Sequence, residues 1–249
     1  MALIELRHVT KRFGRLLVLN NLDFNVEAGT SVVVIGGSGS GKSVLLKHIV
    51  GLLRPDAGEA WFSGQRIDNL NEYRLSDIRQ RFGFLFQMGA LFDSMSVEEN
   101  IAFPLVEHTR KKPEEIAFIV RQKLALVGLP DAGKKMPAEL SGGQRKRVAL
   151  ARAIALGPEV ILYDEPTTGL DPIRADAIND LILKLQHELH VTSIVVTHDM
   201  QSAFKVGDRI VMLNEGHFIF DGTPAEIRAC DNPIVRRFIH GEAASPRSQ

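Results

Sequence analysis

The chain has 249 residues, of which 45% are hydrophobic and 24% are charged, and 30 basic side chains balance 30 acidic ones. These values exclude a disordered chain, and the net charge of zero argues against general nucleic-acid binding through a strongly basic surface. The single cysteine, Cys230, cannot form an internal disulfide, which favours a reducing compartment.

The N-terminal residues carry a charge too early for a secretory signal, and no stretch approaches about 18 uninterrupted apolar residues. We therefore expect a cytoplasmic protein. Any role at a membrane is expected to depend on a partner.

The first part of the chain predicts two strands, over 3–9 and 18–27, that are separated by a basic loop. Phe13 lies in this loop, in front of the phosphate-binding motif described next. Its ring is suited to stack on an adenine base, and local packing at the surface is the alternative.

A glycine-rich segment links a buried strand predicted over 31–35 to a helix predicted over 44–50. It fits the phosphate-binding pattern of Gly, four residues, then Gly-Lys-Ser. Glycines let successive backbone N–H groups face a phosphate chain, and the helix N-terminus adds partial positive charge. Lys42 is expected to reach the β- and γ-phosphates, and the Ser43 hydroxyl to ligate Mg²⁺. The remaining members of the motif are Gly36, Gly37, Ser38, Gly39, Ser40 and Gly41.

The middle of the chain changes from strand-like to helical sequence. After a turn at 55–58 and a strand over 59–63, residues 65–80 are polar and show no clear pattern. A strand over 81–87 places Gln87 at a sheet edge, where ligands bind in α/β folds. Three helical patterns then follow without an intervening strand, which predicts a helical insertion of about 88–155 in an α/β core. These patterns cover 97–106, 114–127 and 144–156.

Strand-like sequence resumes at 160–165 and delivers two carboxylates to its C-terminal end. Asp164 is expected to hold Mg²⁺, usually through water, and Glu165 to act as general base for the attacking water. His198 follows an apolar strand over 192–197, so it should emerge at the same edge and hydrogen-bond the γ-phosphate. Further elements are a helix over 173–190, strands over 209–213 and 217–221, a helix cap at 223–226 and a polar tail from 242.

A second glycine-rich turn, Leu140 to Gln144, opens a helix over 145–156 that Gly157 and Pro158 end. It predicts a second anion-binding helix N-terminus in the same chain. A separate phosphate site in one subunit has no evident use, so the phosphate that this turn meets is expected to belong to another molecule.

Together these motifs resemble the ATP-binding subunits of ABC transporters, over nearly the whole chain. The family's phosphate loop matches 36–43, and the resemblance extends the expected nucleotide contacts to Val44. The family's glutamine loop matches Gln87, and the resemblance implies that this side chain ligates Mg²⁺ and takes part in catalysis. The signature sequence matches Ser141, Gly142, Gly143 and Gln144, and the D-loop includes Asp171. Lys42, Gln87, Glu165 and His198 are therefore the expected catalytic residues.

The resemblance implies an α/β fold: a P-loop NTPase core with a mixed sheet flanked by helices, an N-terminal antiparallel β part and a helical ABC-type subdomain. The expected domain spans 1–241, with the core over about 1–87 and 156–230, the helical subdomain over about 88–155, and a tail at 242–249. It also implies a head-to-tail dimer in which the signature turn of one copy covers the ATP of the other.

Two stretches, 43–53 and 86–97, together with 101–105, resemble the ATPases of MCE-type lipid transport systems, and among them those of the Mla phospholipid system of Gram-negative bacteria. The implied partners are an integral-membrane permease, an MCE-domain lipid-binding protein and a small STAS-domain protein, with the chain peripheral on the cytoplasmic side of the inner membrane. No nucleic-acid partner is expected.

Several alternatives stay open at this point. The apolar side chains after Gln87 can line a groove for a permease helix or fill the core of the helical subdomain; they are Met88, Leu91, Phe92 and Met95. The basic run 145–147 can touch lipid headgroups, but a solvated helix face is the better interpretation.

The rival functions are an ABC transporter with another cargo and a soluble ABC-type ATPase. The soluble repair and translation types usually carry a long coiled-coil insertion or a second ATPase half, and we see neither. A small-molecule kinase does not explain the second glycine-rich turn, and the guanine-reading motif of a GTPase is absent from the sequence.

Overall fold

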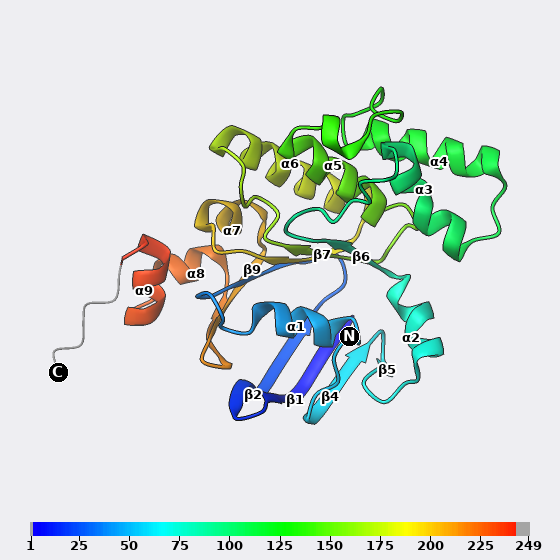
Figure 1. The fold of residues 1–249 in the computed structure, drawn as a ribbon. Coiled ribbons are helices and arrows are strands. Elements are labelled where there is room, and N and C mark those ends of the chain that lie inside the picture. Colours follow the sequence, from blue (N-terminus) through cyan, green and yellow to red (C-terminus); the bar gives the residue numbers. More distant parts are fainter. Residues whose placement is uncertain (1, 243–249) are drawn as a thin grey trace. The chain divides into compact units, whose positions relative to one another are not determined.

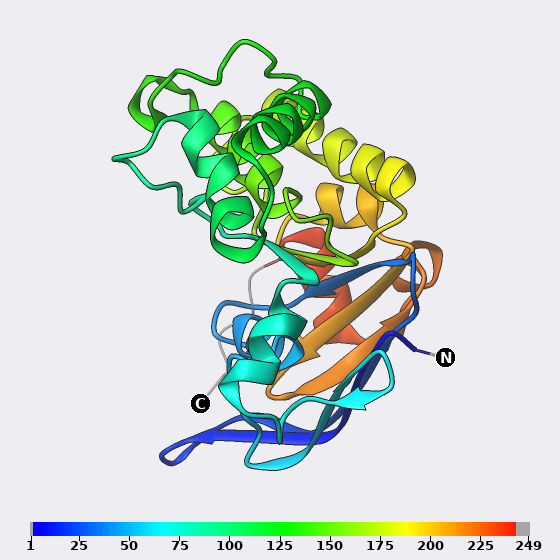
Figure 2. The same cartoon turned by 90° about the vertical axis from the view of Figure 1, so that its right-hand side faces the viewer.

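A computed structural model describes residues 2–242 of the chain. Contacts between residues divide the chain into two units, one formed by 1–69 and 196–249 and the other by 70–195. Each unit contains both strands and helices (Figures 1 and 2).

The first unit contains an antiparallel sheet with the strand order β2-β1-β4-β5. Strand β1 pairs with both β2 and β4, so it lies inside the sheet. Gly14 and Arg15 form the turn of the β1–β2 hairpin, and the expected loop at 11–15 is therefore mostly strand. The strands are β1 (Ile4–Phe13), β2 (Leu16–Val26), β4 (Ala57–Phe62) and β5 (Gln65–Arg66).

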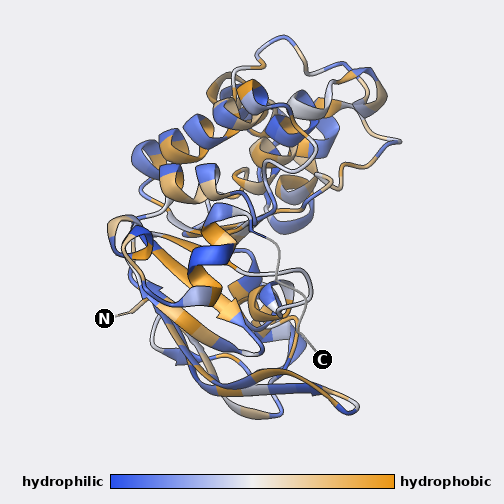
Figure 3. Ribbon diagram, turned by 90° about the vertical axis from the view of Figure 1, so that its left-hand side faces the viewer, coloured by the Kyte–Doolittle hydropathy of each residue, from blue (hydrophilic) through white to orange (hydrophobic). Residues whose placement is uncertain are grey.

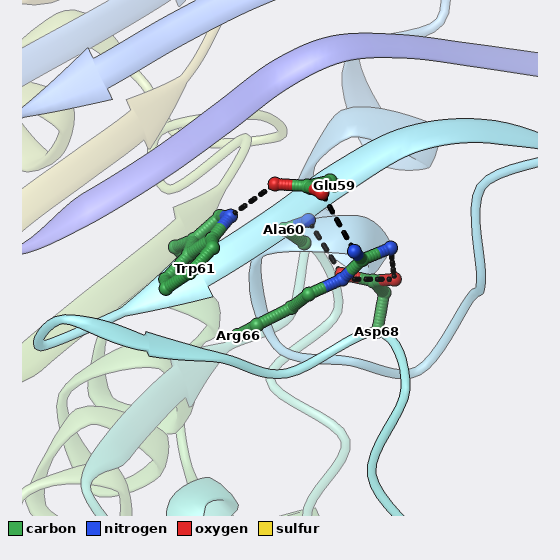
Figure 4. A network of polar contacts seen from close by, with 5 residues as sticks. All are labelled: Glu59, Ala60, Trp61, Arg66 and Asp68. Carbon is green, nitrogen blue, oxygen red and sulfur yellow. Dashed lines mark hydrogen bonds and ion pairs between the residues drawn. The ribbon is translucent and has the colours of Figure 1, made fainter.

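Charged side chains hold the β4–β5 end of this sheet together (Figure 4). Arg66 donates to Glu59 at 2.6 Å and to Asp68 at 2.9 Å, and the Trp61 indole donates to Glu59 at 2.9 Å. Burial raises the pKa of Asp68, but the hydrogen bond and charge of Arg66 together with the hydrogen bond from the Ala60 amide outweigh it, so the pKa of this carboxyl is lowered. The segment after β5 is thereby fixed against the sheet.

A second set of strands in this unit carries the phosphate loop. Strand β3 (Ser31–Ile35) is buried along its whole length and pairs in parallel with β9 (Arg209–Asn214), which pairs antiparallel with β10 (His217–Gly222). A fully buried strand needs the continuous apolar run that predicted it. The helices of the unit are α1 (Lys42–Ile49), α7 (Met200–Val206), α8 (Pro224–Arg228) and α9 (Pro233–His240).

The second unit combines three strands with helices. Strands β8 (Thr192–Val196), β7 (Val160–Asp164) and β6 (Phe82–Leu85) are neighbours in this order, and β6 pairs in parallel with β7. The helices are α2 (Glu72–Arg79), α3 (Val97–His108), α4 (Pro113–Leu126), α5 (Gly142–Ala153), α6 (Pro172–Leu189) and the 3₁₀ turn Pro137–Glu139. In Figure 3 these helices carry alternating hydrophilic and hydrophobic residues, as helices that cover a core do.

Residues 65–80, which show no clear pattern in the sequence, contain β5 and α2. Helix α2 begins after Asn71, whose side chain accepts a hydrogen bond from the Arg74 amide, and it buries only Leu75 and Ile78. This narrow apolar side explains why the helix is hard to predict. The expected helical insertion corresponds to α3, α4 and α5 of the second unit.

Over residues 2–242, no helix combines the length and the apolar character needed to cross a bilayer. The predicted cap at Thr223 is present, with reciprocal hydrogen bonds between Thr223 and Glu226. Most of the tail expected from 242 onwards lies outside the described residues.

Candidate functional site

The phosphate loop connects β3 to α1 and depends on glycine at a sterically closed position. Gly36 has a φ of 151°, and a Cβ atom there would lie 2.3 Å from the Leu213 carbonyl oxygen and 2.8 Å from the Ser40 hydroxyl. Gly41 precedes α1 with a φ of 104° and provides no side-chain cap. The N-terminus of α1 therefore has no side-chain cap that would compete with an anion.

Two polar side chains of the loop are placed to meet phosphate oxygens. The Lys42 ammonium donates to the carbonyl oxygens of Gly36 and Gly37, each at 2.8 Å, so it lies over the loop backbone. The Ser40 hydroxyl is buried and has no hydrogen-bond partner within residues 2–242. A buried hydroxyl without a partner is costly, and a phosphate oxygen would satisfy it. The loop thus fits the group that its sequence pattern predicts.

His198 lies in the same unit as the phosphate loop. The Thr197 amide donates to the Val34 carbonyl at 3.2 Å, which ties the residue before His198 to the strand that leads into Gly36. Asp199 caps helix α7 and leaves His198 exposed at this strand end. The expected position of His198 at a carboxyl edge is therefore present.

Phe13 is the last residue of β1, rather than part of a loop as expected. Its ring is 49% exposed, and the Lys11 ammonium lies 5.6 Å from the ring centroid. Exposure leaves room for a base to stack, while the contact with Lys11 is the local packing that was the alternative. Val44 and Ser43 lie in the first turn of α1, half-buried and exposed respectively.

The carboxylate pair lies in the second unit, at the end of β7. Asp164 is the last residue of that strand, and Glu165 follows with a φ of 52°, a left-handed conformation that is uncommon for a residue with a side chain. The Thr168 hydroxyl donates to the Glu165 carboxylate at 3.1 Å, and the Thr168 amide donates to the Glu165 carbonyl at 3.3 Å. The Glu165 side chain therefore starts from a constrained backbone.

A lysine that the sequence reasoning missed also holds Glu165. Lys146 of helix α5 is only 6% exposed, and its ammonium donates to the Glu165 carbonyl oxygen at 3.2 Å. Burial lowers the pKa of Lys146, and the charge of Glu165 partly opposes this shift. The solvated helix face and the headgroup contact considered for 145–147 are both wrong for this residue. Arg147 instead donates to the Val127 carbonyl at 3.0 Å, and Arg145 is exposed.

The signature turn opens α5 with a capping box. The Ser141 hydroxyl accepts from the Gln144 amide at 3.3 Å, and the Gln144 side chain accepts from the Ser141 amide at 2.9 Å. These bonds are local, and they fix the turn that presents the helix N-terminus. Gly142 and Gly143 lie against the side chains of Leu170 and Arg174, so this end of α5 packs beside the start of α6.

Asp171 and Gln87 are the remaining predicted site residues of the second unit. Asp171 is the N-cap of α6 and pairs with Arg174, with 3.2 Å between Oδ2 and Nε. Gln87 is exposed two residues after β6. Oxygen donors of the kind that Mg²⁺ prefers are present, but Ser43 belongs to the first unit and Gln87 and Asp164 to the second. Their meeting at one ion is part of the proposal below.

Comparison with known proteins identifies the family. The model of the ABC transporter family matches residues 19–168. The chain is 44% identical over 243 residues to the probable ribonucleotide transport ATP-binding protein mkl of Mycobacterium bovis, covering 98% of this chain and 68% of that protein. It is 42% identical over 244 residues to the intermembrane phospholipid transport system ATP-binding protein MlaF of Haemophilus influenzae, covering 98% of this chain and 92% of that protein.

Solved structures agree with this assignment. The dimeric ATP-binding cassette MJ0796 in a post-hydrolysis state with ADP and phosphate is similar with a TM-score of 0.81 at 34% identity, over 89% of this chain and 98% of that one. The CbiO1 subunit of a Clostridium perfringens transporter gives 0.86 at 30% identity, over 95% and 94%. The chain therefore belongs to the ABC transporter family and is one of its ATP-hydrolysing subunits.

Proposed function

We propose that the chain powers an MCE-type transporter that moves phospholipid between the inner and outer membranes of a Gram-negative bacterium. The observation that carries this proposal is the 40–42% identity to the MlaF proteins of Escherichia coli and H. influenzae over 98% of the chain. The resemblance of 86–97 to MCE-type ATPases supports the same cargo. Transport of a ribonucleotide is the second candidate, because the mycobacterial relative mkl carries that name.

ATP binding begins at the phosphate loop. The N–H groups around Gly36 to Gly41 and the N-terminus of α1 would surround the phosphates, and the buried Ser40 hydroxyl would gain an acceptor. Lys42 would exchange its carbonyl partners for the β- and γ-phosphates. Phe13 would stack on the adenine, a role that its exposed ring permits.

Hydrolysis requires groups from both units. The side-chain oxygens of Ser43, Gln87 and Asp164 would hold Mg²⁺, which when bound neutralises charge on the β- and γ-phosphates. Glu165 would accept a proton from the attacking water, and His198 would hydrogen-bond the γ-phosphate. The left-handed backbone and the Thr168 hydroxyl limit the directions that the Glu165 carboxylate can take.

The second glycine-rich turn would complete the site from another copy of the chain. The Gly142 and Gly143 amides lie in the first turn of α5, between the capped amides of Ser141 and Gln144, and Asp171 lies at the neighbouring helix start. We propose that these groups cover the γ-phosphate bound to the partner copy in a head-to-tail dimer. ATP binding then closes the dimer and hydrolysis opens it. This opening and closing would drive a conformational change in a membrane partner.

A groove in the second unit is suited to that membrane partner. It has a volume of about 600 Å³ and lies between α2, β6, α3 and α5. Aromatic rings pair along it, with centroids 4.2 Å apart for Phe84 and Phe86 and 4.8 Å apart for Phe92 and Phe103. Met88 beside it is 86% exposed. We propose that a cytoplasmic helix of the permease binds here through apolar side chains.

The complete assembly would also contain an MCE-domain lipid-binding protein and a small STAS-domain protein, with this chain on the cytoplasmic side of the inner membrane. The test is to purify the assembly in detergent through a tag on this chain and to identify its proteins and bound lipids by mass spectrometry. Co-purified permease and phospholipid are expected. Recovery of a permease with ribonucleotide-dependent ATPase activity would favour the second candidate, and recovery without a permease would contradict both.

A matched pair of variants tests the groove in the same assay. Met88→Glu places a charge on the exposed apolar rim and should reduce recovery of the permease at least fivefold. Tyr73→Glu introduces the same charge at another exposed large side chain, which is 80% exposed on α2 and does not line the groove, and it should leave recovery unchanged. Equal recovery with both variants would place the permease elsewhere.

A further inference from the structure

Lys146 is a buried cation for which the reaction scheme above has no role. It lies on the buried side of α5 with Gly143, Ala149 and Leu150, where the helical repeat would lead us to expect an apolar residue. Burying a lysine is costly unless its charge is compensated. The observed compensation is a backbone carbonyl, and that carbonyl belongs to Glu165.

The Glu165 backbone that carries this carbonyl has an uncommon conformation. At a φ of 52°, the Glu165 backbone is in a region that residues with side chains seldom occupy, and such a conformation persists only where neighbours hold it. The Lys146 ammonium and the Thr168 amide both donate to this one carbonyl oxygen, from different elements. A change of the Glu165 φ to a right-handed value would move this carbonyl away from both donors and redirect the carboxylate.

Helix α5 joins this contact to the signature turn. Ser141 caps the helix and Lys146 lies within its second turn, so both belong to the same helical segment. Because the proposed dimer places the signature turn on the partner's ATP, a shift of α5 on ATP binding at one site would reach the glutamate that serves the other site. This step rests on the dimer in the proposed function.

We propose that Lys146 is a positioning residue that holds Glu165 in its left-handed conformation and links nucleotide contact at the signature turn to the catalytic carboxylate. It touches neither ATP nor the attacking water. Its removal should therefore slow hydrolysis without weakening nucleotide binding.

The test compares full-length Lys146→Met and Lys146→Gln. Methionine keeps the length and loses the donor, whereas the glutamine amide can still donate to a carbonyl. Because a small misplacement of a reacting group is costly, Lys146→Met should lower kcat about 10- to 100-fold. Its Kd for ATP, measured without Mg²⁺, should stay within about twofold of the wild type. Lys146→Gln should retain at least a third of the wild-type kcat.

Lys184→Met is the matched control. Lys184 also donates to a backbone carbonyl in this unit, that of Leu126 at 3.1 Å, but it is exposed and lies on α6. It should keep the wild-type kcat. A purely structural role for Lys146 would lower the melting temperature and kcat of both position-146 variants together, without rescue by glutamine.

Three results would overturn the inference: wild-type kcat in Lys146→Met, loss of kcat in a folded Lys146→Gln equal to that in Lys146→Met, or parallel losses of kcat and ATP affinity. If Lys146→Met does not fold, the ATPase activity of Lys146→Gln tests the inference, because the inference requires this variant to hydrolyse ATP. An active Glu165→Gln variant would instead remove the proposed catalytic role of Glu165, on which the inference rests.

Discussion

His48 provides a sharp test of how the structure controls stability, because it is a fully buried histidine on the helix that follows the phosphate loop. Neither ring nitrogen makes a hydrogen bond of good geometry within the described residues, although the Leu53 backbone lies close enough to affect the ring. Burial lowers the pKa of His48 to about 4, and the charge of Lys11 adds to this, while the backbone of Leu53 and the carboxylates of Asp56 and Asp68 partly oppose it. The perturbation is the substitution His48→Gln, which removes the titrating group.

The sign follows from comparing the folded and unfolded chains. The unfolded chain binds a proton at His48 near its ordinary pKa of 6.5, whereas the folded chain resists protonation until about pH 4. Stability is therefore constant above about pH 6.5 and falls as the pH decreases towards 4. Across the whole window the loss is about 3 kcal/mol, and between pH 7 and pH 5.5 it is about 1 kcal/mol.

The assay is thermal unfolding of wild type and variant at pH 7.0 and 5.5. For a chain of this length, about 1 kcal/mol corresponds to roughly 2–4 °C in Tm. Between pH 7.0 and 5.5 the Tm of the wild type should therefore fall by that much more than the Tm of His48→Gln. Comparing the two chains cancels the titration of the carboxylates. The exposed His187→Gln variant is the control and should follow wild type. Parallel pH profiles for wild type and His48→Gln would refute the reasoning.

Two further predictions concern the site. Glu165→Gln should bind ATP with wild-type affinity, hydrolyse it at least about 100-fold more slowly and accumulate as a dimer in size-exclusion chromatography with ATP; full turnover would show that Glu165 is not the base. Gly36→Ala should abolish ATP binding in equilibrium dialysis, because the added Cβ meets the Leu213 carbonyl at 2.3 Å, whereas Gly37→Ala adds a Cβ with no atom within 4 Å and should bind ATP. Equal ATP binding by these two alanine variants would mean that the loop geometry around Gly36 does not shape the cradle.

Local patterns in the sequence were sufficient to predict most of the helices and strands. The apolar runs at 31–35 and 192–197 correspond to the buried strands β3 and β8, and the capping pattern at 223–226 correctly marks the start of α8. The phosphate motif also carries its structural context, a strand before and a helix after. These features depend on neighbours within a few positions of the chain, which is why they can be predicted.

Other features depend on contacts that are distant in the sequence. Lys146 was expected to be solvated because its neighbours are basic, but it is buried by packing and satisfied by a carbonyl 19 positions later. Phe13 was expected in a loop because Lys11 and Arg12 are polar, yet β1 continues to it by pairing with β2. The left-handed backbone of Glu165 was not predicted either, and one of the donors to its carbonyl, Lys146, lies 19 positions earlier in the chain.

The central claim is that one copy's phosphate loop and another copy's signature turn hold the same ATP. Cysteine cross-linking tests it most directly, in a chain that carries Glu165→Gln to retain ATP and Cys230→Ser to remove the native thiol. Ser38 is an exposed residue within the phosphate loop and Arg145 is exposed directly after the signature turn, and each is replaced by cysteine.

With a short bis-maleimide and ATP, the chain with both cysteines should form a covalent dimer. Neither single-cysteine chain should form this dimer, and the chain with both cysteines should not form it without nucleotide. Loss of nucleotide dependence, or absence of the cross-link in a chain that demonstrably binds ATP, would contradict the account.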